Sequence, residues 1–303
     1  MPPNGAEIVM EALQSPKPYS FRREMFNQFR KNHLAMGGLI LIGFFFVIAL
    51  TVLSFAFFKV YFPADPNAIN LTQRLLPPSA SHLLGTDQLG RDVLSRMLHG
   101  SWISLTVGFV SVAIAISIGV LIGSVSGYFR GWVDVVLMRF VDIMMTFPTF
   151  FLILTVVALL GPGFWKVMIV IGLTSWTGTA RFVRAEILSL RQRDFVQAAL
   201  AVGAPSGRII LRHVLPNAMA PVLVSATLGV AGAVLTESGL SFLGFGVQPP
   251  QPTWGNILTE GRLYIFDAWW LTLFPGLAIL AMVLAFNLCG EGIRDALDPR
   301  LRR

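Results

Sequence analysis

Apolar runs long enough to cross a lipid bilayer recur along this chain, and they limit its possible folds more than any other feature. The first runs from Leu34 to Phe58, and a helix of that length, rising about 1.5 Å per residue, crosses ~30 Å of hydrocarbon. Charged residues make up only 13% of the chain, whereas soluble domains carry about 25%. We therefore expect an all-α polytopic membrane protein.

Six transmembrane helices can be placed along the sequence. After 34–58, the further predicted spans cover roughly 101–128, 135–160, 164–180, 218–235 and 269–289. The polar segments around and between them include residues 1–33, 59–100, 181–217 and 291–303. With both termini in the cytoplasm, all but six of the 23 Lys and Arg residues lie on the inner side. The positive-inside rule favours this orientation, and the short basic loops make nucleic acid a poor candidate partner despite the net charge of +7.

The N-terminal segment before the first span has two parts. Residues 1–20 are rich in proline and poor in apolar residues, which predicts a mobile tail. Phe21 to Lys31 alternates aromatic and basic residues, and Phe21, Met25 and Phe29 share one helical face. This pattern is typical of a short helix on the membrane surface, and no cleavable signal peptide is expected.

The longest polar interruption in the later part of the chain, residues 181–217, predicts a helix, a turn and a second helix. Helix-forming residues run from Arg193 to Val202, and Gly203 then suits a left-handed turn that ends the helix. Pro205 suits the start of the next helix, which we expect to reach about Val214. Such a segment is either an ordinary interfacial loop or a compact projection on which another protein docks.

A spaced motif within this segment resembles a known one. Gln197-Ala198-Ala199 is followed after three residues by Gly203 and, nine residues later, by His213-Val214-Leu215-Pro216. This spacing resembles the EAA loop of ABC importer permeases, although Gln197 stands where Glu is usual and His213 where Ile is usual. The residues that the resemblance assigns to ATPase coupling are Arg193, Asp194, Gln197, Ala198, Ala199, Gly203, Arg208, His213, Leu215 and Pro216.

The resemblance extends over nearly the whole chain, from Phe21 to Arg303, and is nearest to the C-type permease subunits of dipeptide, oligopeptide and nickel importers. It implies a type I ABC importer permease fold, with residues 101–290 as its core, in the bacterial cytoplasmic (inner) membrane. It also implies a second homologous permease subunit (B-type), two ABC ATPase subunits and an extracytoplasmic solute-binding protein. ATP and Mg would then be bound by the ATPase subunits, and no cofactor is expected in this chain.

Candidate pathway or gate residues lie in two places. Phe147 and Pro148 belong to a segment similar to one that lines the inner pathway in this family, and Pro148 should kink the third span. Glu237 is expected at the outer end of the fifth span, and Phe242 follows in a Gly- and Pro-rich loop that contains Trp254. That loop is either a rigid structural cover with interfacial aromatics or a gate.

Ionisable residues near the ends of the spans admit more than one interpretation. Arg139 and Asp142 are three residues apart and are expected to pair on one helix face; a proton or ion relay is the alternative. Outside the membrane, the stretch LGTDQLGRD predicts either a structural network of turn caps and ion pairs or a contact with a binding protein. Its candidate residues are Gly85, Asp87, Arg91 and Asp92.

The sequence lacks recognisable machinery for chemistry. It contains no G-x-x-x-x-G-K-[ST] nucleotide loop, no Cys and His spacing typical of a metal centre and no G-x-S-x-G nucleophile motif. We therefore expect a non-catalytic permease without a metal site, driven by partner subunits. Peptides are favoured over nickel because no His or Cys cluster is visible, but nickel and glutathione importers remain alternatives. A secondary transporter would need an intramembrane ion site and inverted repeats.

Overall fold

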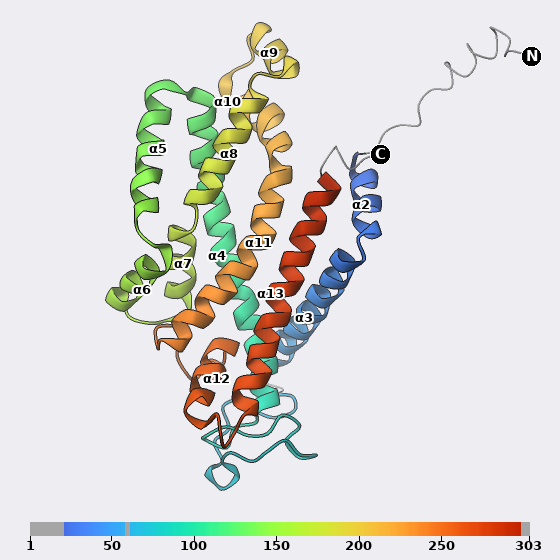
Figure 1. The fold of residues 1–303 in the computed structure, drawn as a ribbon, viewed down its shortest axis with the longest axis vertical. Helices are drawn as coiled ribbons and strands as arrows, with labels where there is room; N and C mark the ends of the chain where they lie inside the picture. Colours follow the sequence, from blue (N-terminus) through green and yellow to red (C-terminus); the bar gives the residue numbers. More distant parts are fainter. Residues whose placement is uncertain (1–20, 58–60, 298–303) are drawn as a thin grey trace, which may run out of the picture.

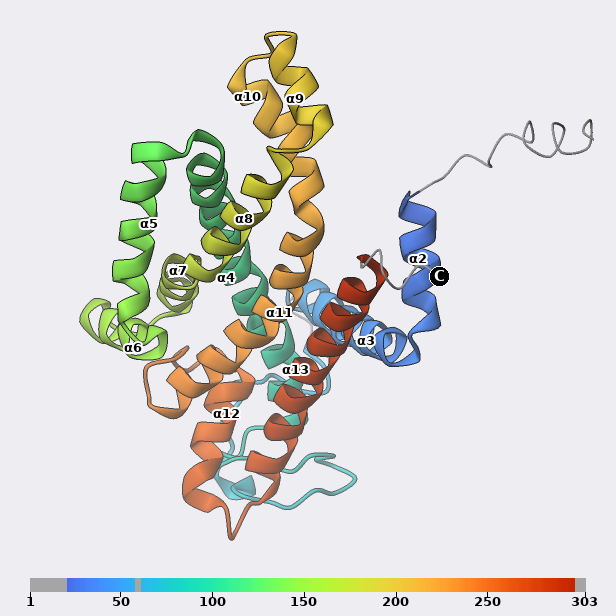
Figure 2. The same cartoon turned by 45° about the horizontal axis from the view of Figure 1, so that its top comes forward.

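The computed structural model describes residues 21–57 and 61–297, which form helices and loops, with a single isolated bridge between Thr86 and Asp92. The predicted tail 1–20, the end of the predicted first span and the terminal arginines after residue 297 lie outside the described residues. The helices run mostly along the long axis of the molecule (Figures 1 and 2).

The N-terminal helices match their predicted bounds closely. Helix α2 covers Phe21–Lys31 and helix α3 covers His33–Phe57. Asn32 joins them: its Oδ1 accepts a hydrogen bond from the backbone N–H of Ala35, and its Nδ2 donates to Asp295. Phe29 is buried beside Gly292, so α2 is held against the end of helix α13 (Trp270–Leu297).

Helix α4, Val93–Phe129, is the central element of the fold (Figure 1). We predicted a span over roughly residues 101–128, and its predicted start was wrong, because the helix begins at Val93 and continues without a break through Gly100. Three of its glycines face helix α8 (Thr177–Leu190). A Cβ atom at Gly119, Gly123 or Gly127 would lie within 2.9 Å of atoms in helix α8, so glycine allows the two helices to pack closely.

The predicted third span is broken. Helix α5 (Gly131–Thr146) and helix α6 (Thr149–Leu160) meet at an angle of 82°. The break falls at Pro148, as expected of a residue that lacks a backbone N–H, and it is a sharp corner rather than a gentle kink. The predicted Arg139–Asp142 pair is wrong, because within the described part of the chain the carboxylate of Asp142 pairs with Arg181.

The predicted fourth span also differs from the structure. Helix α7 ends at Thr174, having begun at Phe164, and helix α8 covers Thr177–Leu190. A break at Ser175 separates them, and α8 continues ten residues beyond the predicted end of the span at Ala180. The first part of the predicted polar loop is therefore helical and belongs to the same helix as the last residues of the predicted span.

The segment after α8 carries two short helices. Helix α9 covers Asp194–Ala201 and helix α10 covers Ser206–Arg208. A π-helical turn, Ile209–Val214, then leads into helix α11, Leu215–Phe242. The predicted second helix does not end before the fifth span, because the chain is helical from Ser206 to Phe242.

Pro216 explains the π-helical turn. Proline has no N–H to donate, and its ring disfavours the regular backbone arrangement before it. The N–H of Leu215 instead bonds to the carbonyl of Ile210, five residues back. This wider turn accommodates the proline without ending the helix. The helix that we expected to end near Val214 therefore continues, with a local change from α-helical to π-helical hydrogen bonding.

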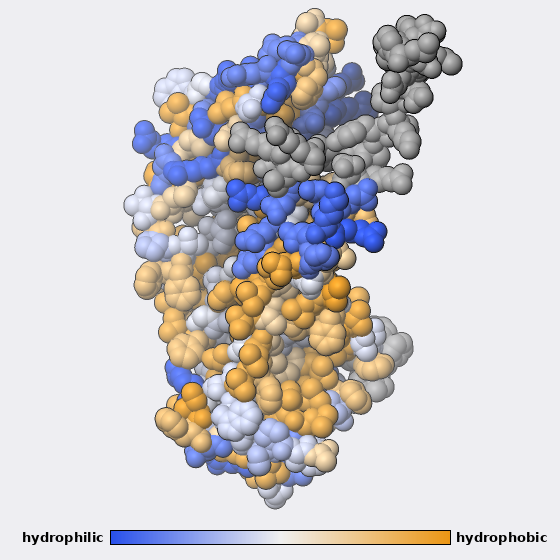
Figure 3. Space-filling model, turned by 45° about the vertical axis from the view of Figure 1, so that its right-hand side comes forward, coloured by the Kyte–Doolittle hydropathy of each residue, from blue (hydrophilic) through white to orange (hydrophobic). Residues whose placement is uncertain are grey.

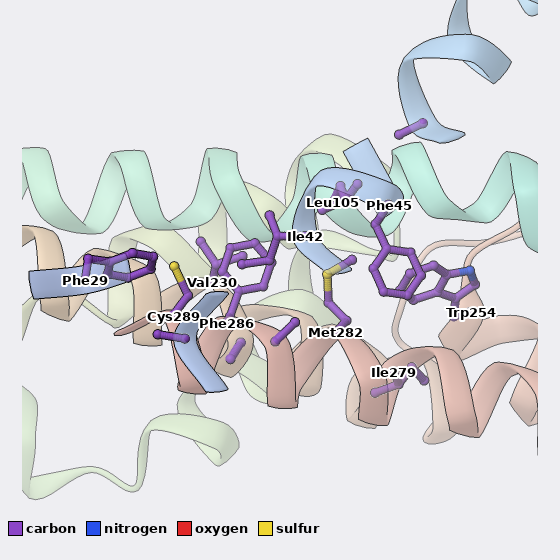
Figure 4. Packing of buried hydrophobic residues seen from close by; sticks show 14 of the residues in the cluster. Phe29, Ile42, Phe45, Leu105, Val230, Trp254, Ile279, Met282, Phe286 and Cys289 are labelled. Atoms are coloured by element: carbon purple, nitrogen blue, oxygen red, sulfur yellow. The ribbon is translucent and has the colours of Figure 1, made fainter. Parts of the chain in front are cut away.

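The outer end of the molecule contains helix α12, Trp254–Gly261, and the loop of residues 61–92. We expected Trp254 in a loop over the outer mouth, but its side chain is only 1% exposed. It packs against Phe45 of α3 and donates a hydrogen bond from Nε1 to the carbonyl of Met97. Figure 4 shows Trp254 at one end of a core cluster that continues along α13 through Met282 and Phe286.

The apolar lengths fit a membrane protein. Within residues 21–57 and 61–297, four helical segments are long and apolar enough to cross a bilayer, or five if α5 and α6 form one bent span. Figure 3 shows a broad hydrophobic band across one side of the molecule, with hydrophilic surface above it and a mixed surface below. The predicted six helices are therefore not all present as unbroken spans.

Candidate functional site

The segment from Arg191 to Val214 projects beyond the ends of the long helices. Figures 1 and 2 show α9 and α10 at the tip of the molecule, on the stalk formed by α8 and the start of α11. We call this segment the projecting loop. Helix α8 leads into this loop through the turn at residues 191–193, and α11 follows directly from its π-helical turn.

The turn at the tip is a Schellman motif. Gly203 adopts a φ of +76°, which glycine reaches without the steric penalty of other residues. Its N–H bonds to the carbonyl of Leu200, and the N–H of Ala204 bonds to the carbonyl of Ala199. These bonds satisfy the last carbonyl groups of α9, and the predicted left-handed turn at Gly203 is confirmed.

Buried apolar side chains fix the projecting loop to the helix ends. Val196 and Ile209 are fully buried, and Ala199 is nearly so. They belong to one cluster with Tyr128 of α4 and Val183 of α8. Each fully buried Val or Ile side chain contributes roughly 1.5–3 kcal/mol, so the loop is a packed unit rather than a loose connection.

The outward face of the loop combines apolar and charged side chains. Val202 is 83% exposed and Leu211 is 66% exposed, and Phe195 is also exposed. Arg193 and Arg208 are exposed on the same projection. Apolar side chains rimmed by arginine are typical of a protein-binding surface.

The other predicted residues of the loop take different positions. Ala198 is exposed, whereas Ala199 faces the packed interior of the loop, so only the first of the pair is available for close approach by a partner. Gln197 is exposed, and its Nε2 donates to the carbonyl of Arg191. A glutamate could not donate this bond, which gives a local reason for an amide at this position.

The remaining residues of the predicted set lie along the stalk. Asp194 is exposed in the first turn of α9, where its charge favours the helix N-terminus. His213 and Leu215 are half-buried, and Pro216 is exposed. The structure therefore brings the predicted loop residues into one compact projection.

An ion pair that links α8 to α5 was not predicted from the sequence. Arg184 donates from Nε and Nη2 to the two carboxylate oxygens of Asp134, each at 2.5 Å. Ser126 of α4 donates to the same carboxylate. Because Asp134 and Arg184 are far apart in the sequence, only the fold brings them together, and their ion pair links α5 to α8.

The candidate pathway residues do not form one site. Glu237 is fully buried in the last turns of α11, and its Oε1 accepts hydrogen bonds from Ser241 and from Thr253, the N-cap of α12. It joins α11 to α12 and does not sit in a loop. Phe147 lies exposed at the corner between α5 and α6, next to the exposed Pro148.

Phe242 is the fourth of these candidates. It is exposed at the end of α11, and the guanidinium of Arg262 lies 5.0 Å from the centre of its ring. A cation over an aromatic ring is a weak stabilising contact. Phe242 is therefore part of the outer surface.

The outer motif forms a buried ion-pair network. Asp87 accepts hydrogen bonds from the backbone of Arg91 and from the side chains of Arg91 and Arg96, the latter two at 2.6 Å. Glu260 of α12 accepts from both arginines. Burial favours a higher pKa for Glu260, but Arg96 and Arg91 outweigh it and hold the pKa of this carboxyl below its ordinary value.

Asp92 and Gly85 complete this motif. Asp92 caps α4 by accepting from the N–H of Ser95, and it lies 2.9 Å from the Nδ1 of His82. Gly85 has a φ of +79°. The structural network that the sequence favoured is present, whereas a contact of this motif with a binding protein stays a prediction.

Arg96 and Glu260 were not among the residues predicted from the sequence. Arg96 has no exposed surface, although it lies in a helix that also crosses the apolar region. Glu260 is 164 residues away from it, and no local pattern links the two. A buried arginine needs a partner, but the sequence does not say which carboxylate supplies it.

Comparison with known proteins gives a consistent result. Residues 119–303 match the family described as binding-protein-dependent transport system inner membrane component. Residues 20–78 match the N-terminal TM domain of oligopeptide transport permease C.

Curated relatives are similar over most of their length. The chain is 42% identical over 280 residues to the dipeptide transport system permease protein DppC of Alkalihalophilus pseudofirmus, covering 92% of this chain and 90% of that one. It is 42% identical to the di/tripeptide transport system permease protein DppC of Pseudomonas aeruginosa, covering 96% and 95%. It is 43% identical to the probable D,D-dipeptide transport system permease protein DdpC of Escherichia coli, covering 84% and 85%.

One solved structure shares the fold. A chain of the MetNI methionine ABC transporter, in an inward-facing conformation, superposes with a TM-score of 0.52 at 17% identity. The match covers 66% of this chain and 96% of that chain.

Proposed function

Because this chain belongs to the family of binding-protein-dependent transport system inner membrane components, we propose that it is one permease subunit of an ATP-driven importer of di- and oligopeptides. The chain is a multi-pass inner-membrane protein of this family. The relatives that it resembles over most of their length are named for dipeptides, di/tripeptides and D,D-dipeptides, which supports a peptide substrate over nickel or glutathione.

The projecting loop is the observation that carries the proposal. It is packed onto the ends of α4 and α8, and its exposed face is apolar with an arginine rim. An ATPase subunit in the cytoplasm would bind this exposed face. Its movement on binding and hydrolysing ATP would pass through Val196 and Ile209 to α8 and α11, and through Arg184 to α5.

Alternating access would follow from this coupling. The pathway opens to one side or the other according to which state of the helices the ATPase pair favours, and ATP drives the change only if the ATPases bind the two states differently. This chain would supply no catalytic residue, and ATP and Mg would be held by the ATPase subunits. A second permease subunit would complete the pathway, and a solute-binding protein would deliver peptide to the outer end.

Six membrane spans with both termini in the cytoplasm are part of the proposal. The bent pair α5–α6 would be the third span, and α7 with the first turns of α8 would be the fourth, broken at Ser175. Breaks in spans are tolerated where they are buried in protein or line a water-filled path. The basic residues of the projecting loop support its cytoplasmic position.

Uptake by the complete transporter tests the proposal. The chain is reconstituted in proteoliposomes with its neighbouring permease, ATPase subunits and binding protein, and entry of a labelled dipeptide is followed with and without ATP. We expect uptake that requires ATP and is unaffected by collapse of a proton gradient. Uptake driven by the proton gradient without ATPase subunits would overturn the proposal in favour of a secondary transporter.

A further inference from the structure

A trough runs along the facing sides of α8 and α11. Its middle part, of about 460 Å³, lies between α4, α7, α8 and α11, and its inner part, of about 810 Å³, lies between α8, α11 and α13. The two parts share Ser225 and Leu228 of α11. Helix α8 lines both parts through Gly178, Phe182 and Glu186, which are one turn apart, so we treat the hollows as one trough.

Two glycines leave space in the trough that packing within the chain does not require. A Cβ atom at Gly178 or Gly232 would meet no atom within 4 Å, and neither residue has a positive φ. At Gly119 and Gly123, by contrast, a Cβ would come within 2.6 Å of α8. Glycine at the first two positions therefore keeps the trough wide rather than allowing two helices of this chain to touch.

Among the described residues, two of the hydroxyl groups that line the trough lack the usual backbone acceptor, whereas Ser111 and Thr236 of the same lining donate to the carbonyls of Met168 and Gly232. Thr227, Thr155 and Ser117 each donate to the carbonyl four residues back, which satisfies a hydroxyl in an apolar environment. Within the described part of the chain, Thr179 and Ser225 have no hydrogen-bond partner, although they line the trough. They remain able to donate to and accept from a molecule that enters.

Charged side chains gather at the inner end of the trough. Glu186 of α8 lies across it from Glu291 and Arg294 of α13. Among the described residues none of the three forms an ion pair or hydrogen bond. Charges of both signs that are unpaired within the described part of the chain suit a solute that itself carries both signs.

We propose that this trough is the part of the transport pathway contributed by this chain, and that it takes an extended peptide by its backbone. Thr179 and Ser225 would bond the backbone amides, and Gly178 and Gly232 would leave room for peptide side chains of any kind. The charged inner end would receive the charged termini of the peptide. The inference rests on the proposed function and deepens it by naming the residues that hold the peptide.

The chemistry of the lining favours a peptide over the other solutes. Neutral hydroxyls can bond any peptide, because backbone N–H and C=O groups are common to all of them. A hydrated metal ion is held instead by several carboxylate, imidazole or thiolate ligands, and the middle of the trough is lined by hydroxyls, glycines and aliphatic residues. Tolerance of side chains and recognition of the backbone would arise from the same lining.

Filling the trough tests this inference. The double variant Gly178→Leu with Gly232→Leu is compared with Gly43→Leu, since Gly43 also has no atom within 4 Å but lies exposed on α3. We expect the double variant to assemble with its partners and to lower ATP-driven dipeptide uptake roughly tenfold or more, a barrier about 1.4 kcal/mol higher. ATP hydrolysis stimulated by the loaded binding protein should persist, because the projecting loop is unchanged.

The outcomes separate this inference from the proposed function. Normal dipeptide uptake by the assembled double variant would show that peptide does not pass here. Failure of the variant to co-purify with the second permease would show that a helix of that subunit fills the trough, and either result overturns the inference. An absence of ATP-driven dipeptide uptake by the unaltered transporter would instead contradict the proposed function.

Accessibility provides a second measurement that does not depend on a bulky substitution. Ser225→Cys is compared with Thr227→Cys in a Cys289→Ala background, using a hydrophilic maleimide and the complete transporter. We expect Ser225→Cys to react, and saturating dipeptide with ATP to slow the reaction several-fold, whereas Thr227→Cys shows no protection. Equal rates with and without peptide at Ser225→Cys would contradict the proposal.

Discussion

The two ends of this protein are built in opposite ways. At the outer end, Asp87, Arg91, Arg96 and Glu260 are charged, largely buried and bonded to one another. At the inner end, the projecting loop holds its shape through apolar packing and a Schellman turn. Its charged residues are exposed, except for the half-buried Arg191, whose guanidinium lies over the ring of Tyr128. Buried charge pairs fix one geometry because either partner alone is costly, whereas an exposed apolar face is available for another protein.

This contrast suggests that the outer end stabilises the fold and that the inner end couples to another protein. The outer end joins the start of α4 to α12 and α13 as a rigid block: Glu260 bonds to Arg96, and Trp270 donates to the carbonyl of Thr86. The inner end connects to α8 and α11, two of the helices that line the trough. Substitutions at the outer end should therefore affect folding, and substitutions at the tip should affect coupling while leaving the fold intact.

The largest effect is expected from Arg96→Met. Removing this buried guanidinium leaves Asp87 and Glu260 without a main partner, and breaking such a pair costs about 3–5 kcal/mol. We expect a large fall in thermal stability and in the amount of folded protein in the membrane, measured by fluorescence-detected size exclusion after heating. Arg74→Met, at an exposed residue of the same end, should change the thermal stability little. An equal loss of stability in both variants would show that the buried ion pairs do not set the stability of the outer end.

Gly203→Val tests the inner end. A Val with φ near +76° is strained by roughly 1–2 kcal/mol or more, yet its Cβ meets no atom within 4 Å, so the tip should change shape without disturbing the spans. We expect transport to be abolished while membrane insertion is normal, as measured by dipeptide uptake and by membrane content.

Gly207→Val is the matched control for this variant. It lies in the same loop, has no positive φ and has open space at its Cβ. Transport by this control should be retained. Normal uptake by correctly assembled Gly203→Val complexes would remove the loop from the coupling mechanism.

Asp134→Asn tests the ion pair between Asp134 of α5 and Arg184 of α8. It weakens a bidentate, partly buried pair with Arg184, and hydrogen bonds to charged groups contribute about 1.5–3 kcal/mol. Asp142→Asn breaks a half-exposed pair with Arg181 and should cost at most ~1 kcal/mol. A double-mutant cycle on thermal unfolding measures both; a larger coupling for the exposed pair would contradict the assignment.

The smallest expected effect is a pH dependence confined to the outer end. Because the pKa of Glu260 is depressed, its stabilising contribution is present above the ordinary glutamate pKa of about 4.3 and is lost as the pH falls through the lower folded value. Thermal stability should therefore be flat near neutral pH and decline below about pH 4. Glu260→Gln should be less stable and decline less steeply; parallel curves would exclude this carboxyl as the cause.

Local signals in the sequence were sufficient for several elements. The bounds of α2 and α3, the corner at Pro148 and the left-handed turn at Gly203 follow from apolar length, the missing proline N–H and the conformational freedom of glycine. Each of these properties belongs to one residue or one stretch. The compact projecting loop followed from the same kind of information.

The failures have a common physical origin. Asp142 pairs with Arg181 rather than with Arg139, and Arg96 pairs with Glu260, because the partners come from helices that are distant in the sequence. Trp254 is buried by α3 rather than placed at an interface. Helix ends were misjudged where membrane helices extend into polar segments, since polarity marks the water boundary and does not end a helix.

Cross-linking at the two ends tests the central claim that the projecting loop is the surface to which an ATPase subunit binds. In a Cys289→Ala background, Val202→Cys at the tip is compared with Phe266→Cys, which is 97% exposed at the outer end, in the complete transporter after each thiol is labelled with a benzophenone maleimide, whose photoactivated ketone inserts into C–H bonds of a neighbouring subunit. The account predicts that Val202→Cys links this chain to an ATPase subunit and that Phe266→Cys does not. A link from Phe266→Cys to the ATPase, with none from Val202→Cys, would contradict it.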